Sequence, residues 1–282
     1  MRFATFSGSA FADGGKAAHV LKLAFDAPLG VFSDVHGNLP ALQAVLDDIR
    51  ARGATPVCLG DLVGYGPFPN EVTRLVHGLD IPCLMGNYDR GIGFDTGDCG
   101  CVYKTDEQRA EGAASLAWTQ MAVSETSKAV LRSLHDRFEL PTAAGTMLAV
   151  HGSPRRINEY LFEDRPTSAL ARIATSTLTT DGLPYRAILF GHTHLPYTRH
   201  VPTGAPARPL TTLVNVGSAG RPKDGDWRAC YALLNPPTSA DTPVDAQFVR
   251  VPYDFERLVR AVAATSLTTV FDGPPAPDLP RG

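Results

Sequence analysis

The sequence predicts an α/β fold with a largely parallel sheet. Short apolar runs alternate with stretches of helical periodicity, and a glycine beside a polar residue closes several of the runs. Short continuous apolar runs are typical of strands buried on both faces, and alternation of strand, loop and helix is the pattern of a sheet covered by helices. We expect one domain over residues 23–270, after an N-terminal extension (residues 1–22) and before a loose tail (residues 271–282).

The first half of the chain repeats the unit of strand, polar loop and helix. Apolar residues on one face indicate a helix over residues 39–50, with Leu42, Val45, Leu46 and Ile49 as its buried side. The remaining elements of this half are expected as strands over residues 23–33, 56–59 and 81–85 and a helix over residues 71–77.

A helical insertion is expected over about residues 89–137. Residues 89–101 are rich in glycine and polar side chains, whereas residues 105–122 and 125–137 carry helical patterns with few breakers. Beyond it, β signals dominate and indicate a second sheet. The elements expected there are strands over residues 146–150, 187–190, 213–216 and 230–234, a helix over residues 167–174, turns over residues 202–209 and 235–243, and a loose end over residues 274–282.

Composition excludes several classes of protein. The chain has 282 residues, 44% of them hydrophobic, and a formal net charge of −3. No apolar run approaches the roughly 20 residues that span a bilayer, so a membrane-embedded protein is excluded. No basic excess would draw the chain onto a nucleic-acid backbone. The N-terminal stretch is a poor signal peptide, because Ser7, Gly8 and Ser9 interrupt it.

The cysteines favour a cytoplasmic location. Their number, five, is odd and the chain is long, which is not the pattern of a secreted disulfide framework. Cys99 and Cys101 are close in sequence, as in a metal or redox pair. With no second cysteine cluster, two loop thiols are the favoured interpretation.

Five polar clusters each follow a short apolar run directly. Loops from neighbouring strands converge at the carboxyl edge of an α/β sheet, and adjacent glycines let the backbone turn sharply there. The clusters are Asp34-Val35-His36-Gly37-Asn38, Gly60-Asp61, Gly86-Asn87, His151-Gly152 and Gly191-His192-Thr193-His194.

The residue types in these clusters suit transition metals. Aspartate, asparagine and histidine supply oxygen and nitrogen donors without thiolate, which favours Mn, Fe, Zn or Ni over Ca or Mg. Seven donors exceed the usual need of one ion, whereas two ions that share a carboxylate would use them all, and paired metals are a known device for phosphoester hydrolysis. The candidate ligands are Asp34, His36, Asp61, Asn87, His151, His192 and His194.

Each candidate ligand alone has a structural interpretation. Asp34 would serve as a helix cap, Asn87 as a turn residue and His151 as a hydrogen-bonded core histidine. His192 and His194 are more specific, since alternate residues of an extended segment point to one side. The joint occurrence at five strand ends is what predicts a metal centre.

In this order, the five motifs resemble the calcineurin-like metallophosphoesterase superfamily. The resemblance covers roughly residues 31–234. Further matches at Asp61-Leu62-Val63-Gly64-Tyr65-Gly66-Pro67 and Asn215-Val216-Gly217-Ser218 are similar to its compact bacterial and archaeal phosphodiesterase branch. The resemblance implies a four-layer αββα sandwich.

The resemblance also implies a role for each ligand. Asp34, His36, Asp61 and His194 would bind one ion, and Asp61, Asn87, His151 and His192 the other, with Asp61 as the bridge. A hydroxide between two divalent transition-metal ions, with manganese favoured, would attack phosphorus in line. In the carried-over mechanism the catalytic residues are Asp61, Asn87 and His192, which act through the metals and by positioning the phosphate.

One position departs from much of the superfamily. A histidine often follows the asparagine and is thought to protonate the leaving group, but this chain has Tyr88 there. A phenol with a reference pKa near 10 is a poor acid at neutral pH. We therefore expect a preference for good leaving groups, and the sequence identifies no general acid.

Substrate contacts are expected near the motif loops, and each has a structural alternative. Asn38 is alternatively a cap, Tyr65 a loop anchor, Tyr88 a packing residue and Arg221 a solvated side chain. We also hypothesise that the insertion covers the metal site and selects substrates.

These observations predict a two-metal hydrolase of a small phosphoester, more specifically a phosphodiesterase. The alternatives are a phosphomonoesterase, a nuclease, for which the missing basic excess is unfavourable, and a protein-binding scaffold such as the retromer subunit that shares this fold. No membrane partner is expected. The natural substrate, the metal and the oligomeric state cannot be read from the sequence.

Overall fold

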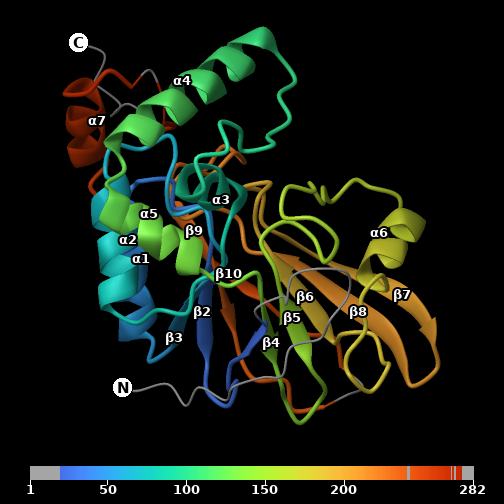
Figure 1. Ribbon diagram of the computed structural model, residues 1–282. Coiled ribbons are helices and arrows are strands. Elements are labelled where there is room, and N and C mark those ends of the chain that lie inside the picture. The colour runs from blue at the N-terminus through green and yellow to red at the C-terminus, as the bar shows by residue number, and fades with distance from the viewer. Residues whose placement is uncertain (1–19, 240–241, 268, 270, 275–282) are drawn as a thin grey trace, which may run out of the picture.

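The fold contains two β-sheets that face each other, with helices on both outer sides (Figure 1). This computed structural model describes residues 20–239, 242–267, 269 and 271–274. Within these ranges, no helix combines the length and the apolar character needed to cross a membrane.

The larger sheet has six strands in the order β1-β4-β5-β6-β8-β7. Its β5–β6 and β6–β8 pairs are parallel, whereas β7 and β8 form a long antiparallel hairpin. The strands are β1 (Val20–Lys22), β4 (Arg137–Leu140), β5 (Met147–Ala149), β6 (Ala187–Phe190), β7 (Tyr197–Ala205) and β8 (Arg208–Asn215).

The smaller sheet has four strands in the order β10-β9-β2-β3. Its β2–β3 pair is parallel, as expected for strands joined through a helix, and its other two pairs are antiparallel. The strands are β2 (Leu29–Phe32), β3 (Thr55–Cys58), β9 (Ala229–Leu234) and β10 (Gln247–Val251).

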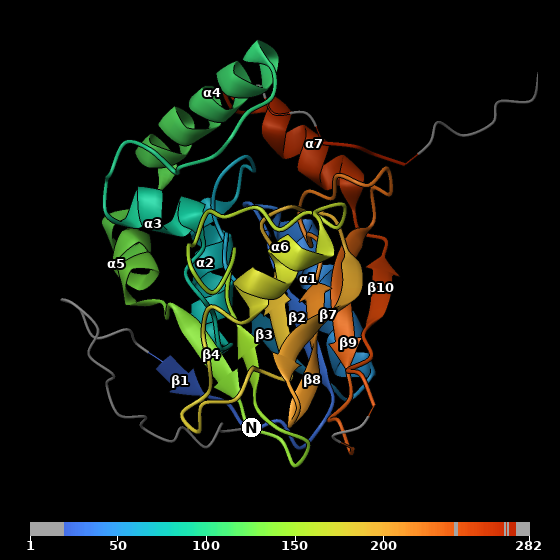
Figure 2. The same ribbon diagram turned by 90° about the vertical axis from the view of Figure 1, so that its right-hand side faces the viewer.

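Helices cover the outer face of each sheet, and the two views agree on this arrangement (Figures 1 and 2). On the smaller sheet lie α1 (Leu39–Ala51), α2 (Pro69–Gly78) and α5 (Glu125–Ser133), and on the larger sheet lies α6 (Thr167–Ala174). The remaining helices are α3 (Asn87–Gly93), α4 (Asp106–Ala122) and α7 (Phe255–Ala263). In both figures α4 runs across the top of the molecule.

Three apolar clusters define the layers. Val31 and Leu189, on different sheets, are buried in the cluster between the sheets. The next residue of β2, Phe32, packs towards α1, and the next of β6, Phe190, packs towards α6. This alternation follows from the two-residue period of a strand. The expected αββα sandwich is therefore confirmed.

Helix starts follow local capping chemistry. The side chain of Asn38 accepts a hydrogen bond from the Ala41 N–H at the start of α1. Thr105, Ser124 and Asp254 cap α4, α5 and α7 in the same way. Each cap satisfies one of the N–H groups that the first turn of a helix leaves without a partner.

Three expected strand or helix boundaries were wrong. The strand expected over residues 23–33 spans only β2, because residues 26–27 form a bend just before Pro28. Residues 81–85 make only isolated bridges through Cys83 and Leu84, since Pro82 has no N–H for a ladder. The helix expected over residues 125–137 ends at Ser133, where Leu134 already has an extended backbone (ψ 153°).

The turn expected over residues 202–209 was also wrong. These residues extend the β7–β8 hairpin up to the pair Ala205 and Arg208, with an irregularity between Pro202 and Ala205. Proline is tolerated there because β7 is an edge strand. Strand β10 and helix α7 were not anticipated.

The chain ends are described in part. Strand β1, which pairs with β4, covers the last three residues of the segment assigned to an N-terminal extension. The remainder of that segment, residues 1–19, and most of the loose end expected over residues 274–282 lie outside the described residues, as do residues 240–241 of the expected turn.

Candidate metal centre

Loops after four strands and the start of one helix meet at one edge of the sandwich. Asp34 and His36 follow β2, Asp61 follows β3, and His151 follows β5. The loops are tied together by backbone hydrogen bonds, from the Asp34 N–H to Gly60 O (2.9 Å) and from the His36 N–H to Asp61 O (2.9 Å). The last two histidines, His192 and His194, follow β6, and Asn87 begins α3.

Several of these residues have a left-handed backbone. Non-glycine residues rarely adopt positive φ, and such strain is concentrated at functional sites. Among the described residues, only eight non-glycine positions have it, and most belong to these loops: Asp34 (54°), His36 (48°), Asp61 (56°), Tyr65 (59°), His192 (65°) and His194 (64°). The backbone is held in strained conformations where the polar side chains converge.

The first group of donors consists of Asp34, His36 and His194. Nε2 of His194 lies 3.3 Å from Oδ1 of Asp34 and 3.2 Å from Nε2 of His36. All three side chains are buried. Three donor atoms that converge in this way form a candidate site for one ion.

The second group consists of Asp61, His151 and His192, with Asn87 beside it. The donor atoms of the first three lie within 4.8 Å of one another. Oδ1 of Asn87 is 3.0 Å from Nε2 of His151. Asn87 therefore places a fourth oxygen donor at this group.

Asp61 lies between the two groups. Its Oδ2 is 3.4 Å from Nε2 of His151, in the second group, and 3.7 Å from Nε2 of His36, in the first. Its Oδ1 accepts a hydrogen bond from the Tyr88 N–H (2.8 Å). This arrangement orients one carboxylate oxygen towards both groups.

Three of the histidines are oriented by backbone carbonyls. Nδ1 of His36 lies 3.0 Å from Val63 O, and that of His151 lies 2.8 Å from Leu59 O. Nδ1 of His194 lies 2.5 Å from the carbonyl of Arg221. A histidine that donates from one ring nitrogen to a carbonyl directs its other ring nitrogen elsewhere, so each Nε2 faces the other candidate ligands and is the atom that would bind a metal.

Burial controls the charges of the site. It lowers the pKa of His36 to about 3 and, together with the charge of His151, that of His192 to about 3. Both imidazoles are therefore neutral at pH 7. Burial also opposes the charge of His151, but attraction to Asp61 and Asp34 outweighs it and raises the pKa to about 10. For Asp34, attraction to His194 outweighs burial, and its pKa lies well below the usual range.

Two of the candidate metal-ligand atoms are buried and make no hydrogen bond in the described part of the chain. They are Oδ1 of Asp34 and Nε2 of His192, one from each group. A buried polar atom without a partner is costly unless another group, such as a cation, satisfies it. The residues therefore fit a pair of metal ions.

Glycines make the close approach of the loops possible. A Cβ added at Gly86 would lie 2.0 Å from Oδ1 of Asp61, and one added at Gly191 would lie 2.4 Å from Oδ2 of Asp34. Any larger residue at either position would displace a carboxylate of the site.

Asp89 supports the site and was missed by the sequence analysis. Its carboxylate accepts hydrogen bonds from the backbone N–H groups of Asp61 (2.7 Å), Leu62 (2.8 Å), Val63 (3.3 Å) and Gly86 (3.0 Å). It thus joins the loop after β3 to the start of α3. The sequence feature that could have identified Asp89 is its position three residues after Gly86, the N-cap of α3, where a capping box has an acidic residue.

Cys101 contacts a candidate ligand directly. The Asn87 amide donates to Cys99 O (3.0 Å) and to Sγ of Cys101 (3.3 Å), and the two sulfurs lie 2.8 Å apart. These interactions orient the Asn87 oxygen towards His151. The sequence favoured two loop thiols here, and the structure adds that their loop touches the site.

Asn38 is used within the protein. It is fully buried and caps α1, while its amide nitrogen donates to Gly220 O (2.8 Å) and the Tyr253 hydroxyl (3.2 Å). The structure therefore favours the capping role over the expected substrate contact, because the amide groups already have partners.

Tyr88 is also buried, with 1% of its surface exposed, and its ring lies 5.4 Å from that of His36. Burial raises the pKa of the Tyr88 phenol well above its ordinary value. Packing is therefore the role that the structure favours for Tyr88.

Arg221 lies over Tyr65 and contacts the insertion. Its guanidinium is 4.1 Å from the centre of the Tyr65 ring, and Nη2 is 2.7 Å from Oε1 of Glu111 in α4. Tyr65 in turn lies 5.1 Å from the His36 ring and is largely buried. Arg221 is thus a half-buried, paired side chain beside the first group, which differs from the solvated alternative.

Comparisons with known proteins agree with this fold. The model of the calcineurin-like phosphoesterase superfamily domain matches residues 28–238. A protein of Methanocaldococcus jannaschii, described as uncharacterized protein MJ0912, is 30% identical over 252 residues, which cover 85% of this chain and 93% of that protein.

Two solved structures share the fold. The metallophosphoesterase from Sphaerobacter thermophilus is 28% identical with a TM-score of 0.59, over 84% of this chain and 93% of that one. The hypothetical protein PH1004 from Pyrococcus horikoshii is 22% identical with a TM-score of 0.67, over 85% of this chain and 94% of that one. At this identity, the similarity supports the fold alone.

The fold and the two donor groups define a metal-dependent phosphoesterase. The chain belongs to the calcineurin-like phosphoesterase superfamily. Membership and the paired donor groups together indicate a centre for two divalent metal ions.

Proposed function

We propose that the protein is a phosphodiesterase that hydrolyses a small phosphoester with two divalent metal ions. One ion would be held by Asp34, His36, Asp61 and His194, and the other by Asp61, Asn87, His151 and His192. Bound there, the two ions would act as Lewis acids that activate water and neutralise charge on the phosphoryl oxygens.

The observation that carries the proposal is the position of the Asp61 carboxylate. Oδ2 of Asp61 faces Nε2 of His36 at 3.7 Å and Nε2 of His151 at 3.4 Å, while its other oxygen is held by the Tyr88 N–H. A carboxylate held in this way is suited to bridge two ions. The unpartnered atoms of Asp34 and His192, one in each group, add a separate reason to place a cation at both.

The protein's own groups would position the phosphate. His192 and Asn87 lie at the second group, where their donor atoms would fix the ion that contacts the phosphoryl oxygens. The backbone around Asp61 is held by hydrogen bonds to Asp89, and its carboxylate accepts the Tyr88 N–H, so this ligand is already oriented before the substrate binds. Preorganised polar groups of this kind reduce the cost of reaching the transition state.

Two features favour diesters with good leaving groups. The phenol of Tyr88 is buried and weakly acidic, so it is a poor source of a proton for an alkoxide leaving group. The charge of Arg221 is offset by Glu111. Arg221 therefore has less positive charge to pair with the second negative charge of a monoester dianion. A diester carries one negative charge.

The donor set supports the proposed metal, and the cysteines support the proposed compartment. Imidazole and carboxylate donors suit manganese, which we propose as the metal, and also iron, nickel and zinc. The five cysteines are free, which supports a cytoplasmic location.

The insertion would cover the site and select substrates. Two contacts support this role, the ion pair of Glu111 with Arg221 and the hydrogen bond of Asn87 with Cys99 O. Both join the insertion to residues at the donor groups, which places α4 and the loop that carries Cys99 beside the site.

Metal-stripped protein reloaded with Mn, Ni, Zn or Mg tests the proposal. We expect hydrolysis of bis(p-nitrophenyl) phosphate with a higher kcat/KM than of p-nitrophenyl phosphate, and a loss of both activities in Asp61→Ala. Cyclic nucleotides and short DNA extend the panel to the nuclease alternative. Two bound metals without any hydrolysis would instead favour a protein-binding scaffold.

A further inference from the structure

An aromatic stack extends from the second donor group towards the surface. The ring of Tyr160 lies 3.9 Å from that of His192, and the rings of Tyr160 and Phe162 are stacked at 5.5 Å with an interplanar angle of 9°. Phe162 is the outer member and is half-buried. The ammonium of Lys104 lies over it, 5.7 Å from the ring centre.

A cavity of about 450 Å³ lies at this stack. Its volume is within the roughly 300–1,000 Å³ that small-molecule sites occupy. One wall is the segment 100–104 of the insertion, and the other is the loop between β5 and α6. The lining side chains that matter here are Val102, Lys104, Arg156, Asn158, Tyr160 and Phe162.

The cavity adjoins the donor groups. A smaller cavity of about 180 Å³ is lined by Asn87 and shares Gly100 and Asn158 with the larger one. Nδ2 of Asn158 donates to Gly100 O (3.1 Å), so the two walls are joined at this boundary. A ligand with one end at Asn87 and His192 would place its other end against the stack.

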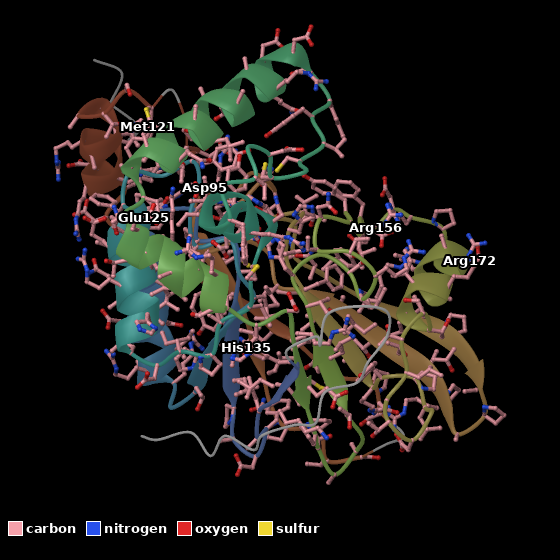
Figure 3. All side chains as sticks on the ribbon, viewed as in Figure 1. Asp95, Met121, Glu125, His135, Arg156 and Arg172 are labelled. Atoms are coloured by element: carbon pink, nitrogen blue, oxygen red, sulfur yellow. The ribbon has the colours of Figure 1, made fainter. Side chains whose placement is uncertain are left out.

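The cavity has unpaired positive charge. Arg165 and Glu159 face each other at 3.5 Å and offset one another. In the ranges that the structure describes, no carboxylate forms an ion pair with Lys104 or Arg156, and both side chains are exposed. Figure 3 places Arg156 on the loops beside α6, between that helix and the part of the molecule that carries α3.

From this juxtaposition we infer that the cavity binds the base of a nucleotide, with Phe162 as the stacking surface and Lys104 and Arg156 as partners for phosphate. The inference rests on the proposed function and assigns nucleotides as its substrate class. The base would replace Lys104 over the Phe162 ring, and this long, exposed side chain would move to a phosphate oxygen.

Other ligand classes fit the cavity less well. An apolar chain would cover the aromatic rings but leave two cations without partners. An inorganic anion would pair with the cations and leave the exposed ring face uncovered. A nucleotide has a flat aromatic base and anionic oxygens, and stacking on an aromatic side chain accepts any base.

The first test compares two diesters with the same leaving group, methyl p-nitrophenyl phosphate and the p-nitrophenyl ester of thymidine 5′-phosphate. For the manganese-loaded full chain we expect a higher kcat/KM with the thymidine ester. Phe162→Leu should reduce this preference about tenfold, mainly through KM, because base stacking contributes on this scale. Phe162→Tyr, which keeps a ring, should retain the preference.

Phe94→Leu is the matched control, since Phe94 is an exposed residue at the end of α3, outside the cavity. It should leave the preference unchanged. Equal kcat/KM for the two esters, or an equal loss on both in Phe162→Leu, would overturn the inference while leaving the phosphodiesterase proposal intact.

A binding measurement separates the two proposals. Equilibrium dialysis of adenosine 5′-diphosphate and of adenosine requires no turnover. The double variant Lys104→Gln/Arg156→Gln should weaken the diphosphate at least several-fold more than adenosine, and Phe162→Leu should weaken both. If no diester is hydrolysed but these shifts appear, the proposed function fails and the nucleotide site stands. If neither adenosine 5′-diphosphate nor adenosine binds, the site is refuted.

Discussion

Oδ2 of Asp61 lies 3.4 Å from Nε2 of His151, and both side chains are buried. A protonated imidazole beside a carboxylate places one positive charge where the proposed ion would lie. The pair therefore connects metal binding to the protonation of His151, and it makes the bridge directly testable.

Replacement of Asp61 by asparagine should remove the bridge. We expect bound manganese to fall below two per chain. We also expect kcat/KM for bis(p-nitrophenyl) phosphate to fall by at least about 100-fold, because the loss of a residue that only supports a metal ligand already costs up to about 100-fold. Inductively coupled plasma mass spectrometry measures the metal. Asp47→Asn, an exposed aspartate on α1, is the control and should keep both metals. Full metal content and activity in Asp61→Asn would contradict the bridging role.

Metal binding should release a proton from His151. Because its pKa in the metal-free protein is about 10, the imidazole is protonated at pH 7, and that proton must leave before Nε2 can bind a cation. The apparent affinity should therefore rise with pH, by up to about tenfold per unit, and level off above about pH 10. His36 and His192, each with a pKa of about 3, are already neutral and add no slope.

Calorimetry checks this proton release at pH 7–8 in buffers of different ionisation enthalpy. We expect about one proton to be released per chain that binds metal. Heats that do not depend on the buffer would show that His151 is neutral before the metal binds.

Gly86→Ala should disturb Asp61 more than it disturbs the fold elsewhere. The added Cβ would meet Oδ1 of Asp61 at 2.0 Å, so the carboxylate or its loop must move. We expect a destabilisation of about 1–3 kcal/mol and weaker metal binding, measured by urea unfolding and metal titration. At Gly78 in α2, an added Cβ meets nothing within 4 Å, so Gly78→Ala is the control. Identical behaviour of the two variants would show that the contact is unimportant.

Asp89→Asn should weaken metal binding without removing a candidate ligand. The new amide group would face backbone N–H groups that now donate to the carboxylate. Loss of such a support typically reduces metal affinity about 10–100-fold. Asp254 also accepts a backbone N–H, but it caps α7, which carries no candidate ligand, so the control Asp254→Asn should leave affinity unchanged. Competition with a chelating dye measures both.

Glu111→Gln should change the preference between monoesters and diesters. It frees the charge of Arg221, which can then bind the second negative charge of a monoester dianion. The ratio of kcat/KM for p-nitrophenyl phosphate to that for bis(p-nitrophenyl) phosphate should rise several-fold, the effect of about 1 kcal/mol. Glu107→Gln, on the same helix, is the control. An unchanged ratio would mean that Arg221 does not contact the phosphate.

Much of the site could be predicted because its signals are local. Each candidate ligand follows an apolar run within a few residues, and Gly86 and Gly191 mark the close turns. The same periodicity predicted α6 and β6 with their observed bounds. Proline made the prediction of strands ambiguous. Pro202 lies inside the β7–β8 pair, where a turn was expected, whereas a strand was expected around Pro82 and only isolated bridges form there.

By itself, the sequence determined the types of donor, their order at the strand ends and the family, because these depend on residue identity and short-range periodicity. Only the tertiary structure decided which distant residues meet. Examples are Glu111 with Arg221, Asp89 with the loop after β3, and Phe162 with the segment 100–104. These contacts join positions far apart in the chain, and they form only when the packing of two sheets and their helices brings the loops to one edge. The identities of the donor residues therefore follow from the sequence, whereas their convergence and the environment proposed to select a substrate follow from the packing.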